Sequence, residues 1–236
     1  SLMDATDASR LDKGEPQTVQ GLKHGEEVQP WVENPMAAGE ILDGGKRLLA
    51  WESGDYQLTR ADKTVARVTA SQPRAISVTG PWSLSFPAGW GAPEQLDLPS
   101  LKPWSELGNP ETRAFSGSAT YTCTVNLDAV APDTRLMLDL GRVSVMAEVS
   151  VNGKSVGRLW TAPFRMDITP FVTAGSNGIA VKVTSTWFNR LAYDASLPEA
   201  QRKTWTLKAP AGNSPLPPAG LMGQVVLHQG QVMKLP

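Results

Sequence analysis

Regular alternation of apolar and polar positions is the strongest pattern in this chain, and it is clearest between residues 143 and 151. Apolar residues occupy every odd position from Val143 to Val151, whereas Ser, Met, Glu and Ser occupy the even ones. A period of two along this run predicts a strand with one buried face. Asn152-Gly153 follows and favours a type I′ turn, in which both central residues have positive φ. Residues 154–160 are therefore predicted to return as the partner strand.

Similar short β-prone runs recur along the chain, separated by turns rich in Pro and Gly. The predicted strands cover residues 46–52, 55–60, 64–69, 77–86, 114–127, 135–140, 143–151, 155–161, 164–168, 178–185, 203–207 and 223–228. Pro198–Arg202 is the best short helical segment, and no helical period longer than about two turns is evident. Many short strands at close spacing predict an all-β fold, a jelly-roll β-sandwich.

Composition divides the chain into three parts. Residues 1–36 are polar and rich in Gly, Gln and Pro, which is typical of a leader or connector with little regular structure. Residues 37–76 are predicted to form a small β meander, too small to be stable alone, which leans on the next domain or completes a preceding one. Residues 77–232 are predicted to form the jelly-roll domain. Within it, the segment 87–112 is rich in Pro, Gly and Trp and is expected to be a long ordered loop.

Charge and motif content exclude several classes of function. The net charge is −1, which gives no electrostatic reason to expect nucleic acid or anionic lipid as a partner. No apolar segment approaches the roughly 20 residues that span a bilayer. The single cysteine, Cys123, cannot form an intrachain disulfide, and its place in an alternating run predicts a buried thiol. With only two histidines, neither a Ser-His-Asp triad nor a zinc site is expected.

Carboxyl groups are the other residues to consider for catalysis. Glycoside hydrolysis needs two of them roughly 5 to 9 Å apart across the scissile bond. The sequence spacing selects no such pair among its 23 acidic residues, many of which fall at turns or on polar strand faces. We therefore predict no catalytic residue in this chain, and activity of the chain by itself is not expected.

The segment beginning TSTWFNR at Thr184 has the composition of a sugar-binding loop. It follows an apolar strand and starts a long excursion that ends near Gly220. Proteins bind sugars with aromatic faces and with amide, carboxylate and guanidinium groups. The candidate sugar-binding residues are Trp187, Asn189, Arg190, Asp194 and Trp205, and weaker candidates are Trp160, Arg165, Trp90 and Trp104. The alternative is a packed aromatic loop that caps the sandwich, with Arg190 paired to Asp194.

The order of several motifs resembles known carbohydrate-active families. VNGKSVG, WTAPFRMDITPFV and AGSNGIAVKV, in this order, are similar to the sugar-binding β-sandwich domain of glycoside hydrolase family 2. The chain also resembles, more closely, the C-terminal part of family 106, the α-L-rhamnosidases. That resemblance rests on WESGDY, GPW, FPAGWG, FSGSATY, TWFNRL and AGLMG, and it covers about residues 45–230. It implies a galactose-binding-like jelly roll.

Enzymes of these families resemble one another in having a separate catalytic (β/α)₈ barrel, and this chain has no room for one. The resemblance therefore implies a non-catalytic carbohydrate-binding or accessory domain of a larger bacterial glycoside hydrolase that acts on plant or microbial polysaccharide. Its expected partners are carbohydrate and the catalytic barrel of the same polypeptide. A purely structural buttress, or a protein-interaction sandwich without sugar contact, is the alternative.

The resemblance also bears on location and on metal content. We expect a periplasmic or secreted enzyme, and no signal peptide is visible in this sequence. No cofactor is expected. Jelly rolls of this type often resemble one another in carrying a structural calcium ion, many of whose ligands are backbone oxygens, so the sequence leaves calcium open.

Overall fold

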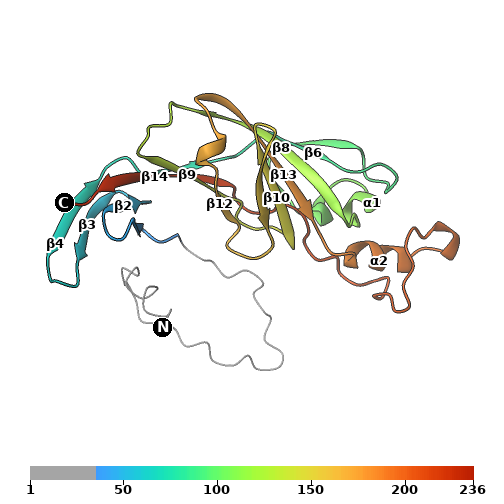
Figure 1. The fold of residues 1–236 in the computed structure, drawn as a ribbon. Coiled ribbons are helices and arrows are strands. Elements are labelled where there is room, and N and C mark those ends of the chain that lie inside the picture. The colour runs from blue at the N-terminus through green and yellow to red at the C-terminus, as the bar shows by residue number, and fades with distance from the viewer. Residues whose placement is uncertain (1–35) are drawn as a thin grey trace. The chain divides into compact units, whose positions relative to one another are not determined.

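The computed structural model describes residues 36–236, which form two compact units. Unit 1 comprises residues 36–74, 133–135 and 229–236, and unit 2 comprises residues 75–132 and 136–228. The leader predicted for residues 1–36 lies outside the described residues, apart from its last position. Figure 1 traces the strands of both units along the chain.

Unit 1 is built from short antiparallel strands. They are β1 (Gly39–Leu42), β2 (Arg47–Ala50), β3 (Gly54–Thr59), β4 (Val65–Ala70) and the end of β14 (Val226–Lys234). β2 pairs with β1 on one side and with residues 231–234 of β14 on the other, while β3 and β4 form a separate hairpin. Side chains such as Leu48, Tyr56 and Leu235 share a small core. The three strand predictions between 46 and 69 are confirmed to within a few residues, but pairing with the far end of the chain was not predicted.

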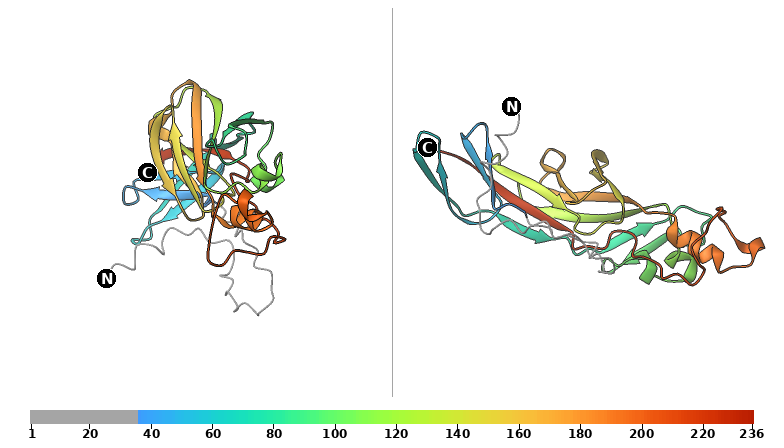
Figure 2. Two further views of the ribbon diagram at one scale, coloured as in Figure 1. Left: turned by 90° about the vertical axis from the view of Figure 1, so that its right-hand side faces the viewer. Right: turned by 90° about the horizontal axis from the view of Figure 1, so that it is seen from below.

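Unit 2 contains a six-stranded antiparallel sheet in the order β11-β10-β13-β8-β6-β7. These strands are β6 (Trp82–Ser85), β7 (Gln95–Leu98), β8 (Ser118–Leu127), β10 (Met146–Val151), β11 (Lys154–Leu159) and β13 (Gly175–Thr184). β10, β13 and β8 run side by side in the views of Figures 1 and 2. The long β8 and β13 pair over ten consecutive positions and form the centre of the sheet.

A second group of strands completes the sandwich of unit 2. It contains β5 (Arg74–Ser77), β9 (Thr134–Asp139), β12 (Arg165–Asp167) and the first residues of β14, with β9 between β14 and β12. Apolar side chains of both groups, among them Val149, Val181, Leu138 and Leu227, pack into one core cluster. Burying two apolar sheet faces against each other is the arrangement that alternating strands favour. The predicted all-β sandwich is thereby confirmed.

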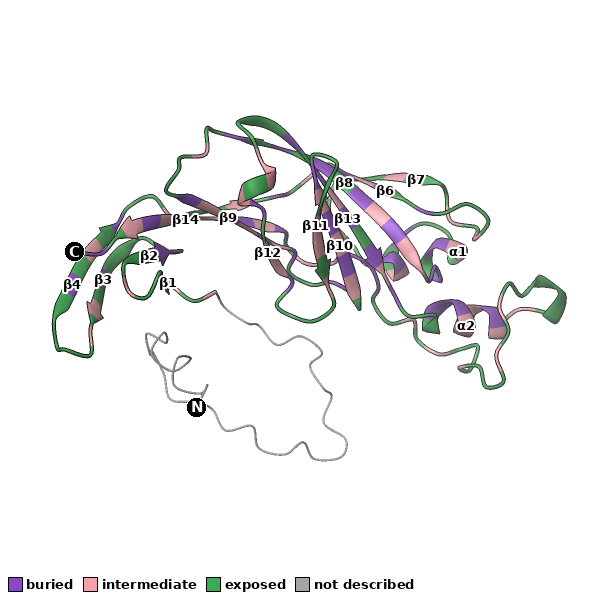
Figure 3. Ribbon diagram, viewed as in Figure 1, coloured by how far each residue is buried: buried purple, intermediate pink, exposed green. Residues whose placement is uncertain are grey.

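Burial along β10 follows the predicted alternation from Ala147 to Val151 (Figure 3), and Asn152 and Gly153 have the positive φ values of 52° and 75° that the predicted turn requires. The start of this strand was predicted wrongly. Val145 has φ 48° and is 51% exposed, and the strand begins at Met146. Ser144 is buried instead, because its hydroxyl accepts a hydrogen bond from the amide of Gly220 at 2.9 Å.

Helical segments of unit 2 account for the other differences. They are η1 (Trp104–Glu106), α1 (Pro110–Arg113), η2 (Thr169–Phe171), α2 (Phe188–Ala195) and η3 (Glu199–Gln201). α2 was not predicted, because polar residues occupy most of its buried face and leave no apolar period. The predicted helix at 198–202 is the single turn η3. The strand predicted at 203–207 is wrong, since these residues are not in a strand and Leu207 is exposed. The 87–112 segment, predicted as a loop, contains β7, η1 and the first three residues of α1.

Candidate functional site

The excursion between β13 and the returning chain, residues 187–209, is called here the 187–209 segment. α2 forms its first part. Arg190 lies in the first turn of α2 and is 1% exposed. Its Nη1 pairs with the Glu111 carboxylate of α1, and its Nη2 lies 2.5 Å from Asp194 Oδ1. The guanidinium also lies over the rings of Trp90, at 6.0 Å, and Tyr193, at 5.3 Å. Arg190 therefore joins α2 to two segments of unit 2 that are distant in sequence.

Asp194, one turn after Arg190, ties the end of the segment back to the helix. Its Oδ2 accepts hydrogen bonds from the amides of Lys203 at 3.1 Å and Thr204 at 2.7 Å, and from the Thr204 hydroxyl at 2.5 Å. Burial by itself would raise the pKa of Asp194. The hydrogen bonds from Arg190 and Thr204 outweigh it and hold the pKa below its usual value. Asp194 is therefore a buried anion that fixes the path of the segment.

Asn189 completes this polar interior. It is buried, and its Nδ2 donates a hydrogen bond to the carbonyl oxygen of Pro217 at 2.9 Å. The pairing of Arg190 with Asp194 is the one that the packed-loop alternative specified. Asn189 Nδ2, both Nη atoms of Arg190 and both carboxylate oxygens of Asp194 already have partners in the protein, so a sugar contact by these residues stays a prediction. Glu111 is a member of the network that sequence reasoning missed, since nothing in the spacing links it to α2.

Two tryptophans of the 187–209 segment are exposed. Trp205 is 81% exposed and lines a cavity of about 510 Å³. The cavity is also lined by Asp194 and by five more polar residues, Glu199, Arg202, Lys203, Thr204 and Thr206. Trp187 is 45% exposed, and its ring centroid lies 5.2 Å from that of Trp90 at an interplanar angle of 57°. The structure thus brings Trp187 together with the weaker candidate Trp90, and Trp205 together with Asp194.

The remaining weaker candidates lie apart from this segment. Trp160 follows β11 and is exposed. Trp104 has no exposed surface and packs edge to face with Phe86 and Phe115 in the core. Arg165 on β12 pairs with Asp139 on β9 at 2.6 Å.

His228 lies 3.9 Å from the same carboxylate of Asp139. Burial lowers its pKa, and the charge of Asp139 only partly counters this effect. Within residues 36–236, no group of three or more His, Cys, Asp and Glu side chains is arranged to hold a metal ion, and no helix is long and apolar enough to cross a membrane.

Comparison with known proteins identifies the family of this chain. Residues 45–206 match the family model described as "Glycosyl hydrolases family 2, sugar binding domain". The chain belongs to this family. A "Putative beta-glucuronidase" of Formosa agariphila is 41% identical over 150 residues, which are 62% of this chain and 13% of that protein.

Solved structures share this fold. A rhamnosidase from Novosphingobium sp. PP1Y matches with a TM-score of 0.63 and 28% identity, over 83% of this chain and 24% of that chain. A Bifidobacterium dentium beta-glucuronidase, solved with coumarin-3-O-glucuronide, matches with a TM-score of 0.51 and 20% identity, over 69% of this chain and 31% of that one. The second likeness shows the fold alone. The chain spans about an eighth of the length of its curated relative.

Proposed function

We propose that this chain is a non-catalytic accessory module of a larger bacterial glycoside hydrolase of the rhamnosidase type. The family match supports an accessory sugar-binding domain, and the small share of each relative that the chain spans leaves most of those proteins for a catalytic domain. The likeness to the Novosphingobium rhamnosidase over 83% of this chain supports the rhamnosidase type. Because polysaccharide is too large to enter a cell, we propose that the parent enzyme works in the periplasm or outside.

The cavity beside Trp205 is the proposed place of sugar contact. An exposed aromatic face can pack against the C–H surface of a sugar ring, and polar groups beside it can bind the hydroxyls. Trp205 offers such a face, and Glu199, Arg202 and Lys203 line the same cavity. The buried network of Arg190 and Asp194 holds the backbone on which these groups stand. This combination of a free aromatic face with a fixed support is the observation that carries the proposal.

A calorimetric titration tests it. The 236-residue chain is titrated with rhamnose, galactose, glucuronate and rhamnose-containing oligosaccharides, first unaltered and then as Trp205→Ala. We expect saturable binding of at least one ligand and a loss of about tenfold or more in affinity in the variant, since stacking contributes about 1 kcal/mol or more. Trp160→Ala removes a tryptophan of similar exposure, 73% against 81%, that does not line this cavity, and should leave the affinity unchanged. Equal affinity of Trp205→Ala and the unaltered chain would refute the assignment.

A structural buttress is the second candidate function, and one observation favours it. Trp205 and Leu207 are exposed apolar side chains close together in sequence, and large apolar side chains at a surface often mark an interface. In this case none of the sugars would bind the isolated chain up to tens of millimolar. Leu207→Asp would then weaken the association of the chain with the catalytic domain of its parent, while Val65→Asp, an exposed apolar position in unit 1, would not.

A further inference from the structure

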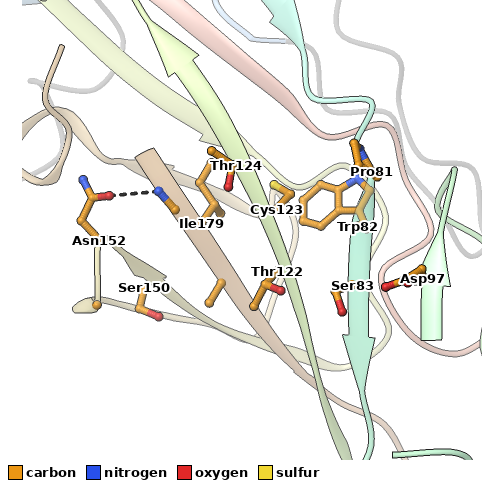
Figure 4. Close-up of a pocket in the computed structure, with 13 residues that line it drawn as sticks. Pro81, Trp82, Ser83, Asp97, Thr122, Cys123, Thr124, Ser150, Asn152 and Ile179 are labelled. Atoms are coloured by element: carbon orange, nitrogen blue, oxygen red, sulfur yellow. Dashed lines mark hydrogen bonds between the residues drawn. The ribbon is translucent and has the colours of Figure 1, made fainter. Parts of the chain in front are cut away.

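A second cavity, of about 760 Å³, lies on the six-stranded sheet of unit 2 and not at the 187–209 segment (Figure 4). Its lining comes from β6, β7, β8, β10 and β13 and from the turn at Asn152-Gly153. The side chains that face it are the outward ones of these strands. Their inward neighbours, such as Cys123 and Ile179, belong to the core.

Strand register places one short side chain from each strand in a single row. Ser83 on β6 is paired with Asp97 on β7 and with Thr122 on β8. Thr122 is paired with Ala180 on β13, and Ala180 with Ser150 on β10. Figure 4 shows Asp97, Ser83, Thr122 and Ser150 along one line across the sheet. With about 4.8 Å between strands, four gaps make this row roughly 19 Å long, which is the length of several sugar units and not of one.

The hollow exists because this row and the next are made of small residues. In the next row Thr124 is paired with Gly178, whose amide donates to Asn152 Oδ1 at 3.0 Å. Gly178 does not have positive φ, and nothing lies within 4 Å of the place a Cβ would take. Neither backbone strain nor crowding therefore requires glycine at this position. A side chain here would instead fill the cavity.

In the neighbouring row on the other side, long charged side chains cover this face of the sheet. Lys182 and Glu148 lie opposite each other on β13 and β10, and Arg158 on β11 follows. Glu148 pairs with Lys182 at 3.1 Å and with Arg158 at 3.0 Å. Long charged side chains thus satisfy one another along this row. The cavity row has no such pairing.

Five polar side chains of the cavity are free to bind, whereas Asn152 is held by the protein. In the part of the chain that the structure describes, the hydroxyls of Ser83, Thr122, Thr124 and Ser150 and the carboxylate of Asp97 make no hydrogen bond or ion pair with the protein. Hydroxyls both donate and accept, which matches a ligand that carries hydroxyls. Asp97 is the only charged residue in the lining, so an anionic ligand would meet repulsion and no cation.

We propose that this row binds an extended neutral glycan that lies across the strands, at a site separate from the cavity beside Trp205. A peptide is a poorer match. Peptides that add to sheets are held by the free backbone groups of an edge strand, and the row is crossed mainly by interior strands whose backbone groups are already paired. The proposal adds a second carbohydrate site to the module, one that takes a chain of sugars.

The test uses the 236-residue chain and three neutral probes, cellohexaose, xylohexaose and mannohexaose, with hexagalacturonate as the acidic comparison. Calorimetry should show saturable binding, at millimolar affinity or tighter, of at least one neutral hexamer and weaker binding of hexagalacturonate. Thr122→Val/Thr124→Val removes two hydroxyls at nearly constant shape and should weaken binding about tenfold or more. Gly178→Val should block it by filling the hollow.

Two control variants show whether the hexamer binds at this row. Thr120→Val makes the same change on the same strand, one row away, and should bind like the unaltered chain. Thr122→Val/Thr124→Val should lower hexamer affinity by the same factor in the unaltered chain and in a Trp205→Ala background, so failure of the site beside Trp205 and failure of this one are distinguishable. Thermal unfolding of each variant verifies its fold. The proposal is overturned if no neutral hexamer binds, if hexagalacturonate binds best, or if the folded Thr122→Val/Thr124→Val protein binds unchanged.

Discussion

The buried ion-pair network of α2 allows a stability change to be worked out from the structure. Arg190→Met keeps a long side chain but removes the charge that joins Glu111 and Asp194. Taking away one member of a buried pair costs about 3 to 5 kcal/mol, because the partner charge is left in a poorly solvated place. Asp194 keeps three donors from Lys203 and Thr204, so its charge stays hydrogen-bonded. The lower end, about 3 kcal/mol, is therefore expected.

Glu111→Gln gives the matched comparison. The Glu111 side chain is 27% exposed, so water can partly compensate Arg190 for the lost charge. The amide also keeps an oxygen that can accept from Arg190. The expected cost is about 1 kcal/mol. Arg190→Met should thus destabilise the protein several times more than Glu111→Gln, although both remove one charge from the same pair.

Urea unfolding followed by circular dichroism, together with hydrogen exchange of the α2 amides, measures both effects. Exchange is needed because the 187–209 segment can open locally without global unfolding. For Arg190→Met, whichever of the two methods gives the larger loss of free energy should show about 3 kcal/mol. If both measurements give less than about 1 kcal/mol, or if Glu111→Gln costs as much, the argument that Arg190 supports the segment is wrong.

Three further outcomes are expected. Acid should destabilise the protein in two stages, because the folded-state pKa values of His228 and Asp194 both lie below their unfolded values. Stability is lost first as pH falls below about 6.5, through His228, and again as it falls below about 4, through Asp194. His228→Gln should remove the first stage. Cys123, whose pKa burial raises to about 12, should react with a thiol reagent in urea but only negligibly in the folded protein at about pH 8. Tyr121→Phe should cost about 1 to 3 kcal/mol in urea unfolding, because the buried amide of Leu221 loses the hydroxyl that accepts its hydrogen bond at 3.1 Å; an unchanged midpoint would contradict this.

The sequence predicts most strands of unit 2, because one face of each is buried and the side-chain period is two. Ala147 to Val151 and the turn at Asn152 follow this rule. α2 escapes it, since its buried face carries Asn189, Arg190 and Asp194. Because these side chains are polar, the sequence shows no apolar helical period. Their burial is explained only by partners distant in sequence, Glu111 and the carbonyl group of Pro217.

Site prediction met the same limit. Composition singled out Trp205, and the structure leaves it exposed beside a cavity. Composition cannot separate it from Trp104, which lies in the core, since exposure depends on contacts with distant residues such as Phe115. The row of Ser83, Thr122 and Ser150 was missed for a related reason. Its members belong to three strands, and only the register puts them on one line.

Unit 1 joins strands that are distant in sequence, and this has a consequence for the protein's synthesis. β2 pairs with the end of β14, and the Arg60 guanidinium donates to the carbonyl oxygen of Pro236, 176 positions later. Ribosomes add about 5 to 20 residues per second, so β2 waits roughly 10 to 35 s for its partner strand. During that interval the apolar Leu48 and Leu49 have no completed sheet to cover them. Slow translation should therefore lengthen the time in which chaperones, or other nascent chains, can capture the first strands of this protein.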